Sequence, residues 1–514
     1  MYKMIFQQKY LFILSMFLLL ISCSEKNIQV RQTIAAYPPV FPDYINVTIP
    51  KNIAPLHFKL TDSCVCEQAR AIFEIADERI EVKAKDKQFA VSPSLWKKLM
   101  KDTPSKTITV TIVAKVADEW ISYQPFSLHV ADETIDPYIA YRLIEPGYEV
   151  WNEMGIYQRC LENYKETPVI TNQQTQYNCM NCHSFCMQDP DRMLFHMRAT
   201  FPGTLLIQGD KIEKLNTKTD QTASFLVYPS WHPSGKYVAF SVNDTKQAFH
   251  TTDPNRIEVY DNVSDVVVYD VEKHEIITSP FLFSQTAFET FPTFSPDGTT
   301  LYFCTSDSVR MPQKYTEVKY DLCAISFDPE RRQFGSKADT LFHARSKGKS
   351  VSFPRVSPNG KFLMFTLSGY GNFSIWHKDA DLYLLNLATK QVYPLDTLNS
   401  SDVESYHSWS SNSHWIVFSS RRIDGLYTRP FIAYIDSEGN ASKPFLLPQE
   451  DIDFYLSFMK SYNIPEFVTG KVKHREYAIS RTAMNDEGID VKFKSPFESS
   501  TGKFGKFATG DSYQ

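Results

Sequence analysis

The chain has 514 residues, of which 14% are aromatic and 22% are charged, and its formal net charge at pH 7 is −5. A chain of this length is too long for one compact core, so we expect two or three domains. The charge is close to balanced and no basic patch stands out, which argues against a nucleic acid as the partner.

The first 22 residues have the pattern of an export signal. Lys3 and Lys9 form a short basic region, and residues 11–21 are an uncharged, mostly apolar run. The run is shorter than the about 20 apolar residues that cross a bilayer. A basic segment before a short apolar one is typical of a secretory signal peptide, so we expect residues 1–22 to direct export.

The end of this signal, L-I-S-C at residues 20–23, resembles the cleavage site of bacterial lipoproteins. The resemblance implies that Cys23 becomes the first mature residue and is lipidated, which would anchor the protein to a membrane. Ser24 gives no inner-membrane retention signal, so we expect an outer-membrane lipoprotein of the cell envelope, facing the periplasm or the surface. The alternative is an ordinary signal peptide followed by a chance cysteine.

Residues 23–135 predict a linker and a small β-sandwich-like domain. Short alternating stretches separated by turn residues are typical of antiparallel strands. These stretches lie at 44–49, 56–60, 71–75, 107–116 and 120–128. One short helix is expected within residues 92–100. The domain would be a spacer or interaction module between the lipid and the rest of the chain.

Residues 136–200 contain the stretch Q-Y-N-C-M-N-C-H-S-F-C-M. The sequence C-x-x-C-H is the attachment signature of c-type cytochromes. In such a site Cys179 and Cys182 would bind the two vinyl groups of one haem from a single helical turn, and His183 would ligate the iron. The stretch therefore predicts one covalent haem c, with Cys179 and Cys182 as attachment residues and His183 as the metal ligand.

Two alternatives to haem stay open for this stretch. In an exported protein Cys179 and Cys182 could form a small-loop disulfide, with His183 merely adjacent. Cys186 lies four residues beyond Cys182, so the three cysteines and His183 could instead bind a metal such as zinc. The sequence assigns no second axial ligand for a haem.

Four segments further along the chain repeat one pattern. They start at Tyr228, Phe291, Phe353 and Tyr406, at spacings of 63, 62 and 53 residues. In each, an aromatic residue and a short strand precede a tight turn, and an alternating strand follows. One unit of four antiparallel strands cannot bury both its faces alone, so the repeats predict the blades of a closed propeller.

The stretches S-P-D-G-T-T-L-Y-F (295–303) and F-S-S-R-R-I-D-G (418–425) resemble the repeats of TolB-like β-propellers. The resemblance is strongest over residues 200–447. It implies an all-β fold in which the N-terminal β-sandwich-like domain is followed by a propeller of about six blades. The fourth repeat departs from the family, because Ser411-Asn412-Ser413 stands where the family has Pro-Asp-Gly.

The resemblance also suggests the domain limits. Residues 201–470 would form the propeller, residues 136–200 would hold the haem motif and a possible first blade, and residues 471–514 would be a polar tail. The segment N-C-M-N-C-H-S-F, followed by M-L-F-H-M-R and G-T-L-L, is similar to exported TolB-like lipoproteins that carry a single haem-type motif just before the propeller.

Six further cysteines remain, and outside the cytoplasm we expect them to be paired or ligated. Cys160 with Cys186 is one candidate pair. Cys304 and Cys323 lie on strands that we expect to be neighbours within one blade. Cys64 and Cys66 are too close in sequence for an easy unstrained disulfide.

These observations favour a haem-bearing envelope lipoprotein, in electron transfer or redox sensing, whose propeller docks a protein partner. The alternative is a TolB-like, non-enzymatic scaffold that binds a protein or a glycan, in which the cysteine pair is structural. The sequence has no G-x-S-x-G elbow, no H-E-x-x-H and no glycine-rich phosphate loop. These absences argue against a hydrolase, and they leave open a haem peroxidase or another small-molecule redox enzyme, which would need an open sixth coordination position.

Overall fold

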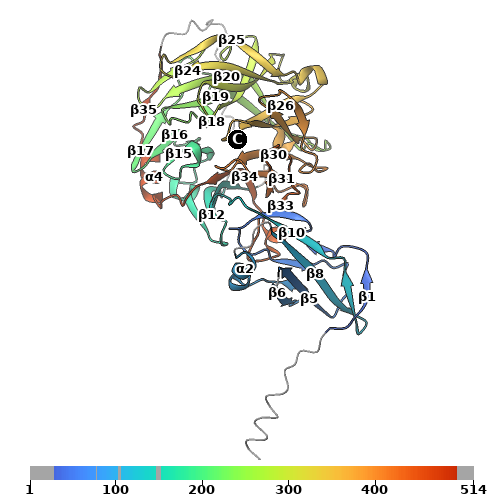
Figure 1. Ribbon diagram of the computed structural model, residues 1–514. Helices are drawn as coiled ribbons and strands as arrows, with labels where there is room; N and C mark the ends of the chain where they lie inside the picture. The colour runs from blue at the N-terminus through green and yellow to red at the C-terminus, as the bar shows by residue number, and fades with distance from the viewer. Residues whose placement is uncertain (1–27, 77, 102–105, 146–151, 495–514) are drawn as a thin grey trace, which may run out of the picture.

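A computed structural model of the chain describes residues 28–76, 78–101, 106–145 and 152–494 (Figure 1). These residues form an all-β protein with an N-terminal domain and a ring of sheets, as the sequence predicted. The lipidation residue expected at Cys23 lies outside the described residues. No helix in the described part of the chain is long and apolar enough to cross a membrane.

The N-terminal domain contains a seven-stranded and a three-stranded sheet, which agrees with the predicted sandwich-like domain. Its elements are β1 (Val30–Ile34), β2 (Val40–Phe41), β3 (Val47–Pro50), β4 (Phe58–Leu60), β5 (Gln68–Ile75), β6 (Glu78–Lys83), β7 (Gln88–Phe89), α2 (Pro93–Leu99), β8 (Lys106–Val116), β9 (Glu119–Tyr123) and β10 (Phe126–Ala131). The expected helix begins after Ser92, whose hydroxyl accepts a hydrogen bond from the Leu95 N–H.

Six sheets of four or five strands follow, and the innermost strand of each packs against that of the next. Blade 1 is β11 (Tyr138–Ile144), β12 (Gly155–Cys160), β13 (Glu166–Thr171) and β34 (Ser461–Val468). Blade 2 is β14 (Met180–Phe185), β15 (Arg192–Met197), β16 (Gly203–Gln208), β17 (Lys211–Asn216) and β35 (Ile489–Asp490). Blade 3 is β18 (Leu226–Trp231), β19 (Tyr237–Phe249), β20 (Ile257–Asp270), β21 (Glu275–Ile277) and β36 (Lys492–Phe493).

The three remaining blades come from consecutive strands. Blade 4 is β22 (Ala287–Phe294), β23 (Thr300–Asp307), β24 (Asp321–Asp328) and β25 (Gln333–Phe342). Blade 5 is β26 (Ser350–Val356), β27 (Phe362–Ser368), β28 (Asp381–Asn386) and β29 (Val392–Pro394). Blade 6 is β30 (Glu404–Trp409), β31 (Trp415–Ser420), β32 (Arg429–Tyr434) and β33 (Phe445–Leu446). The described residues therefore form a six-bladed β-propeller.

Short helices fill the connections. They are η1 (Asn172–Thr175), η2 (Cys186–Gln188), η3 (Tyr315–Glu317), η4 (Arg345–Lys347), η5 (Ser374–Trp376), α3 (Phe454–Ser457) and α4 (Glu476–Ala483).

The ring extends beyond the limits suggested by the sequence. It begins at Tyr138, so that residues 136–200 contribute strands to two blades instead of one. After residue 470, β35 and β36 add parallel fifth strands to blades 2 and 3. The alternating apolar residues Ile489, Val491 and Phe493 pack on the core between these blades, which explains why this part of the expected tail is ordered.

The ring is closed by pairing the two ends of the propeller sequence. In blade 1, β11 pairs antiparallel with β34, and Tyr138 lies opposite Val468. The innermost strand of blade 1 is thus supplied by the C-terminal part of the chain and not by the segment that supplies its other three strands.

The N-terminal domain lies against the ring (Figure 1). A continuous hydrophobic core and several polar contacts join the two. The Ser411 backbone N–H donates to Asp136 at 2.7 Å, and its hydroxyl donates to the same carboxylate at 2.5 Å. Asn412 donates to the Thr134 carbonyl at 2.6 Å. Proline has no N–H to donate, so the departure of the fourth repeat from Pro-Asp-Gly provides a contact that the usual turn could not.

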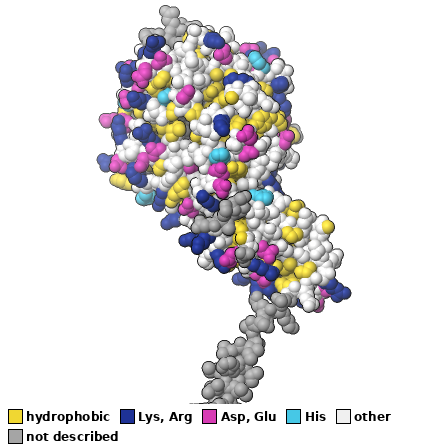
Figure 2. Space-filling view, in the orientation of Figure 1, with side chains coloured by type: hydrophobic (Ala, Val, Ile, Leu, Met, Phe, Trp, Pro, Cys, Tyr) yellow, Lys and Arg dark blue, Asp and Glu magenta, His cyan; other side chains and the backbone are white. Residues whose placement is uncertain are grey.

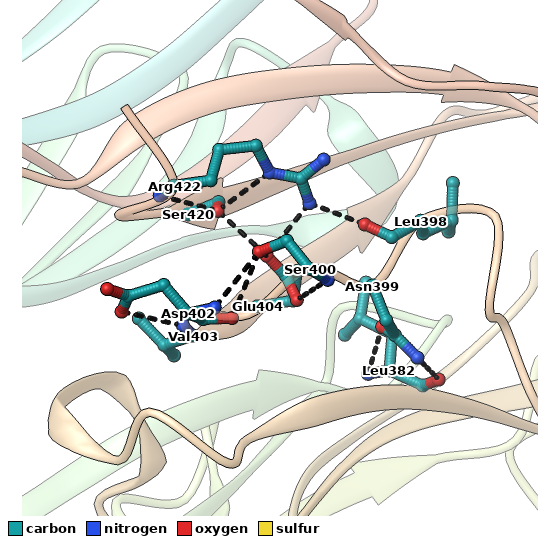
Figure 3. Close-up of polar contacts among 9 residues, drawn as sticks. All are labelled: Leu382, Leu398, Asn399, Ser400, Asp402, Val403, Glu404, Ser420 and Arg422. Atoms are coloured by element: carbon teal, nitrogen blue, oxygen red, sulfur yellow. Dashed lines mark hydrogen bonds and ion pairs between the residues drawn. The ribbon is translucent and has the colours of Figure 1, made fainter. Parts of the chain in front are cut away.

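A buried ionic cluster fixes the connection between blades 5 and 6 (Figure 3). Glu404, which is fully buried, accepts from the Ser400 N–H at 2.9 Å and from the Ser420 hydroxyl at 2.8 Å. Arg422 donates to the same carboxylate at 2.8 Å and also to the Leu398 carbonyl. The carboxylate therefore ties the connecting segment to β31 of blade 6.

Candidate functional site

The six innermost strands are built alike at the central channel. Each has one residue with a left-handed backbone, and the pairing with the neighbouring strand shifts register there. These residues are Cys182 (φ 52°), Tyr228 (φ 49°), Phe291 (φ 49°), Phe353 (φ 50°), Tyr406 (φ 51°) and Ile464 (φ 51°). A positive φ is uncommon for bulky residues, and its sixfold recurrence makes these positions structurally equivalent.

The equivalence extends to the residues that follow. Directly after the left-handed residue, four blades have proline and the other two have His183 and His407. Two residues after it, four blades have serine or threonine and the others have Arg355 and Glu466. The stretch C-H-S-F at 182–185 thus has the same place in blade 2 as Y-H-S-W at 406–409 has in blade 6.

The six left-handed residues form a collar that narrows the channel. The rings of Tyr228 and Phe291 are 4.7 Å apart between centroids, those of Phe291 and Phe353 are 4.1 Å apart, and those of Phe353 and Tyr406 are 4.9 Å apart. Cys182 and Ile464 complete the collar, and all six line one cavity of about 20 Å³. The collar thus closes the channel with apolar and aromatic side chains.

Side chains of the strand pair β19–β20 in blade 3 form hydrogen bonds with blade 5. Tyr370, in the connection before η5, donates to Glu258 at 2.7 Å, and Asn372 donates to Asp261 at 2.6 Å. Glu258 and Asp261 belong to blade 3 and the two donors to blade 5, so these contacts bridge two blades that are not neighbours in the ring.

A second cavity of about 130 Å³ adjoins the first, and the two share Pro229, Arg355, Ser408 and Glu466 as lining residues. All six residues that lie two positions after the collar line this larger cavity. They are Ser184, Ser230, Thr293, Arg355, Ser408 and Glu466. We call these six residues the polar ring. Its four hydroxyl groups, one guanidinium and one carboxyl group give this cavity a polar lining.

Two buried histidines lie between the collar and the polar ring. Neither ring nitrogen of His183 has a partner at hydrogen-bond geometry, although the backbones of Ala140 and Ile464 lie close. His407 Nε2 lies 3.1 Å from the Met364 carbonyl, and its Nδ1 has no partner at hydrogen-bond geometry, although the backbone of Phe353 lies close. Burial lowers the pKa of each histidine to about 3, so both are neutral at pH 7.

The two ionisable residues of the polar ring, Arg355 and Glu466, do not form an ion pair with each other. Burial raises the pKa of Glu466 to about 8, because the nearby Arg355 only partly offsets the loss of solvation. The closest ionisable contact of Glu466 is His183 Nε2 at 3.9 Å. The Arg355 guanidinium donates to the Pro354 carbonyl at 3.2 Å, and no ion pair to it is found among the described residues. At neutral pH the site thus has one cation and a largely protonated acid.

The raised pKa of Glu466 predicts a pH dependence of stability. The folded pKa of about 8 lies above the ordinary value of 4.5, so the stabilising effect of protonation is complete below pH 4.5 and is lost as the pH rises through 8. One pKa unit corresponds to about 1.4 kcal/mol, so we expect a loss of up to about 4 kcal/mol between pH 5 and pH 9, lowered in part by the 16% exposure of the side chain.

Urea unfolding of the wild type and of Glu466→Gln at several pH values measures this loss. The variant cannot ionise at this position, so the difference in unfolding free energy between the two proteins should shift by that amount as the pH rises. A constant difference across the range would show that Glu466 titrates normally.

The structure places the residues of the C-x-x-C-H motif differently from a haem attachment site. Residues 180–185 form strand β14 and not the expected helical turn. Cys179 packs in the hydrophobic core with Met154 and Phe195, whereas Cys182 and His183 line the cavity at the collar. That cavity has the size of about one water molecule, so the folded site does not fit a porphyrin. No finding tests haem attachment directly, and the haem hypothesis stays a prediction.

The expected cysteine pairs are not formed. Cys160, Cys182, Cys186, Cys304 and Cys323 are all thiols outside any disulfide. Cys304 and Cys323 lie on neighbouring strands, as expected, but Cys304 is opposite Leu322 and Cys323 is opposite Phe303. Adjacent residues of a strand face opposite sides of the sheet, and the two thiols accordingly pack in different cores.

The structure gives no support to a zinc site either. Within the described residues, no group of three or more His, Cys, Asp or Glu side chains is arranged to hold a metal ion. Sequence reasoning did not identify Arg355, His407 and Glu466 as site residues. The sequence contained a signal for them, because each follows a collar residue by one or two positions.

Comparisons with known proteins gave structural likenesses only. No family model and no curated protein matches the chain. Among solved structures, TolB from Acinetobacter baumannii has 12% identity and a TM-score of 0.41, over 73% of this chain and 85% of TolB. The periplasmic gluconolactonase PpgL of Pseudomonas aeruginosa has 12% identity and a TM-score of 0.35, over 64% of this chain and 99% of PpgL.

The tricorn protease has 11% identity and a TM-score of 0.34, over 67% of this chain and 34% of the protease. TolB is the family whose repeats this sequence resembles. At these identities and scores the likenesses carry no conclusion about activity or location. The propeller fold rests on the strand order described above.

Proposed function

We propose that the protein is a non-enzymatic recognition scaffold of the cell envelope, in which the propeller binds its ligand at the polar ring. One observation carries this proposal: the Cys182-His183 pair occupies the same strand position as Tyr406-His407, one of the propeller's own repeats. The motif is then explained by the architecture of the ring: Cys182 is a structural residue of β14 in blade 2, and Cys179 directly precedes that strand and packs in the core.

The proposed location rests on the sequence. The basic and apolar segments of residues 1–22 support export, and the L-I-S-C stretch supports lipidation of Cys23 and an outer-membrane anchor. Basic and acidic side chains are interspersed on the face of the molecule shown in Figure 2. The binding surface that we propose is the channel.

The full chain, produced in a host that attaches haem to exported proteins, distinguishes the scaffold from a cytochrome. We expect the purified protein to show no Soret absorbance and no haem staining after denaturing electrophoresis, because β14 buries the motif in the ring. Variants Cys179→Ala and Cys182→Ala should be equally colourless. A c-type cytochrome produced in the same host provides the positive control.

A Soret band that survives denaturation in the wild type and disappears in the double Cys179→Ala, Cys182→Ala variant would overturn the scaffold proposal. It would establish covalent haem, and with it the role in electron transfer or redox sensing.

A further inference from the structure

We propose that the polar ring binds a small hydroxy acid, with the carboxylate of the ligand on Arg355 and its hydroxyl groups on the serine and threonine side chains. This inference rests on the proposed scaffold function and specifies its ligand. It follows from the composition of the ring, the state of its charges and the shape of the two cavities.

Arg355 supplies the reason for a negative charge in the ligand. Arg355 lines both cavities from β26, and no ion pair to its guanidinium is found among the described residues. A partly desolvated cation without an anion is costly, whereas a guanidinium binds a carboxylate through two parallel hydrogen bonds. A ligand carboxylate would therefore supply the charge that the ring lacks.

Glu466 does not supply that charge. It projects from β34 into the same cavities, and no ion pair joins it to Arg355. Its Oε2 atom is buried and has no hydrogen-bond partner. When protonated, this oxygen can donate a hydrogen bond to a ligand carboxylate or hydroxyl, so that Glu466 assists binding of an acid instead of opposing it.

The other four members of the ring favour hydroxyl groups. Ser184, Ser230, Thr293 and Ser408 surround the larger cavity. The Ser408 hydroxyl donates to the Pro465 carbonyl at 2.8 Å and keeps its lone pairs available as acceptors. Several acceptors beside a single cation suit a molecule with one carboxylate and several hydroxyl groups.

The shape of the site limits the size of the ligand. The inner cavity of about 20 Å³ is closed by the collar, and the adjoining cavity of about 130 Å³ is lined by the polar ring. A carboxylate on Arg355 would lie where the two cavities meet, with the hydroxylated part of the ligand in the larger one. A long polymer could place only one terminal unit there.

Calorimetric titration of the full chain at pH 7 with three matched probes tests this inference. Glucuronate has the carboxylate and the hydroxyls, glucose lacks the carboxylate, and cyclohexanecarboxylate lacks the hydroxyls. We expect glucuronate to bind at least tenfold more tightly than either of the others. Lactate, as a fourth probe, distinguishes two classes of ligand. Lactate binding comparable to that of glucuronate would indicate small hydroxy acids in general, and weaker lactate binding would indicate a sugar acid.

Variant Arg355→Gln should weaken glucuronate binding at least tenfold. Arg331→Gln, which removes the same charge from an exposed side chain outside the ring, should leave it unchanged. If Arg355→Gln does not fold, the ring ¹H and ¹⁵N signals of His183 and His407 in the wild type give a second readout. They should shift on addition of glucuronate and stay in place with glucose.

Equal affinity for glucuronate and glucose, or no binding of any acid with unchanged histidine signals, would overturn the inference and leave water as the occupant of the polar ring. A colourless protein that fails to bind the acids would refute the ligand class alone. A protein with covalent haem would refute the scaffold proposal on which it rests.

Discussion

Replacement of Glu404 by alanine is expected to lower the free energy of unfolding by about 3–5 kcal/mol, which is the usual cost of breaking a buried ion pair. The carboxylate is fully buried and accepts hydrogen bonds from Ser400, Ser420 and Arg422 (Figure 3). Without it, the Arg422 guanidinium, with its side chain only 20% exposed, loses its anionic partner, and the Ser400 N–H loses its acceptor. Urea unfolding followed by tryptophan fluorescence measures the change.

Two further variants make the result specific. Glu404→Gln keeps an acceptor oxygen for Ser400 but removes the charge, so its loss should be intermediate. Glu317→Ala breaks an exposed pair with Lys314 and should cost less than about 1 kcal/mol. If Glu404→Ala is no more destabilising than Glu317→Ala, the cluster does not hold the connection between blades 5 and 6.

Ser411→Pro is expected to destabilise the joint between the N-terminal domain and the propeller. The substitution removes both donors to Asp136, a buried carboxylate whose pKa is raised by burial. A hydrogen bond to a charged group contributes about 1.5–3 kcal/mol, so the loss of two should cost about 3 kcal/mol or more. The turn itself accepts proline in other blades, and the cost therefore arises at the joint.

The reverse change in an equivalent turn is the matched control. Pro358→Ser in blade 5 should change the free energy of unfolding by less than about 1 kcal/mol, because a serine fits the same turn. Limited proteolysis gives an independent readout, since a weakened joint exposes residues 132–137 to cleavage in Ser411→Pro only. Equal stability of Ser411→Pro and the wild type would show that the contacts to Asp136 do not hold the domains together.

Much of the fold could be predicted from sequence because blades 3 to 6 share a turn and an alternating strand. Blade 1 could not be predicted in this way, since its innermost strand lies at residues 461–468, far from its other three strands. The strands β35 and β36 were missed for another reason. Each has two residues, which is too short for alternation to distinguish a strand from a polar tail.

The candidate site shows that a short motif does not predict function when its place in the fold is unknown. C-x-x-C-H predicted a haem because three residues matched an attachment signature. In the structure, Cys182 instead has the left-handed backbone that recurs in the innermost strand of every blade. Arg355 and Glu466 become partners in a site only when residues 353 and 464 are aligned as equivalent positions. The sequence already aligns Phe353 with the other repeats, whereas Ile464 is aligned with it only by the left-handed backbone, which an isoleucine side chain does not indicate.

Closure of the ring by β11 and β34 has a consequence for the order of folding. Tyr138 can pair with Val468 only when the C-terminal part of the propeller is present. Closure of the ring therefore depends on a contact between segments that are far apart in sequence, and such contacts form slowly. Synthesis and export both deliver the N-terminal segments first. Until β34 arrives, β11 keeps an unpaired edge, and an open edge is a template for aggregation. During folding, the risk of aggregation is therefore concentrated at the edge of β11.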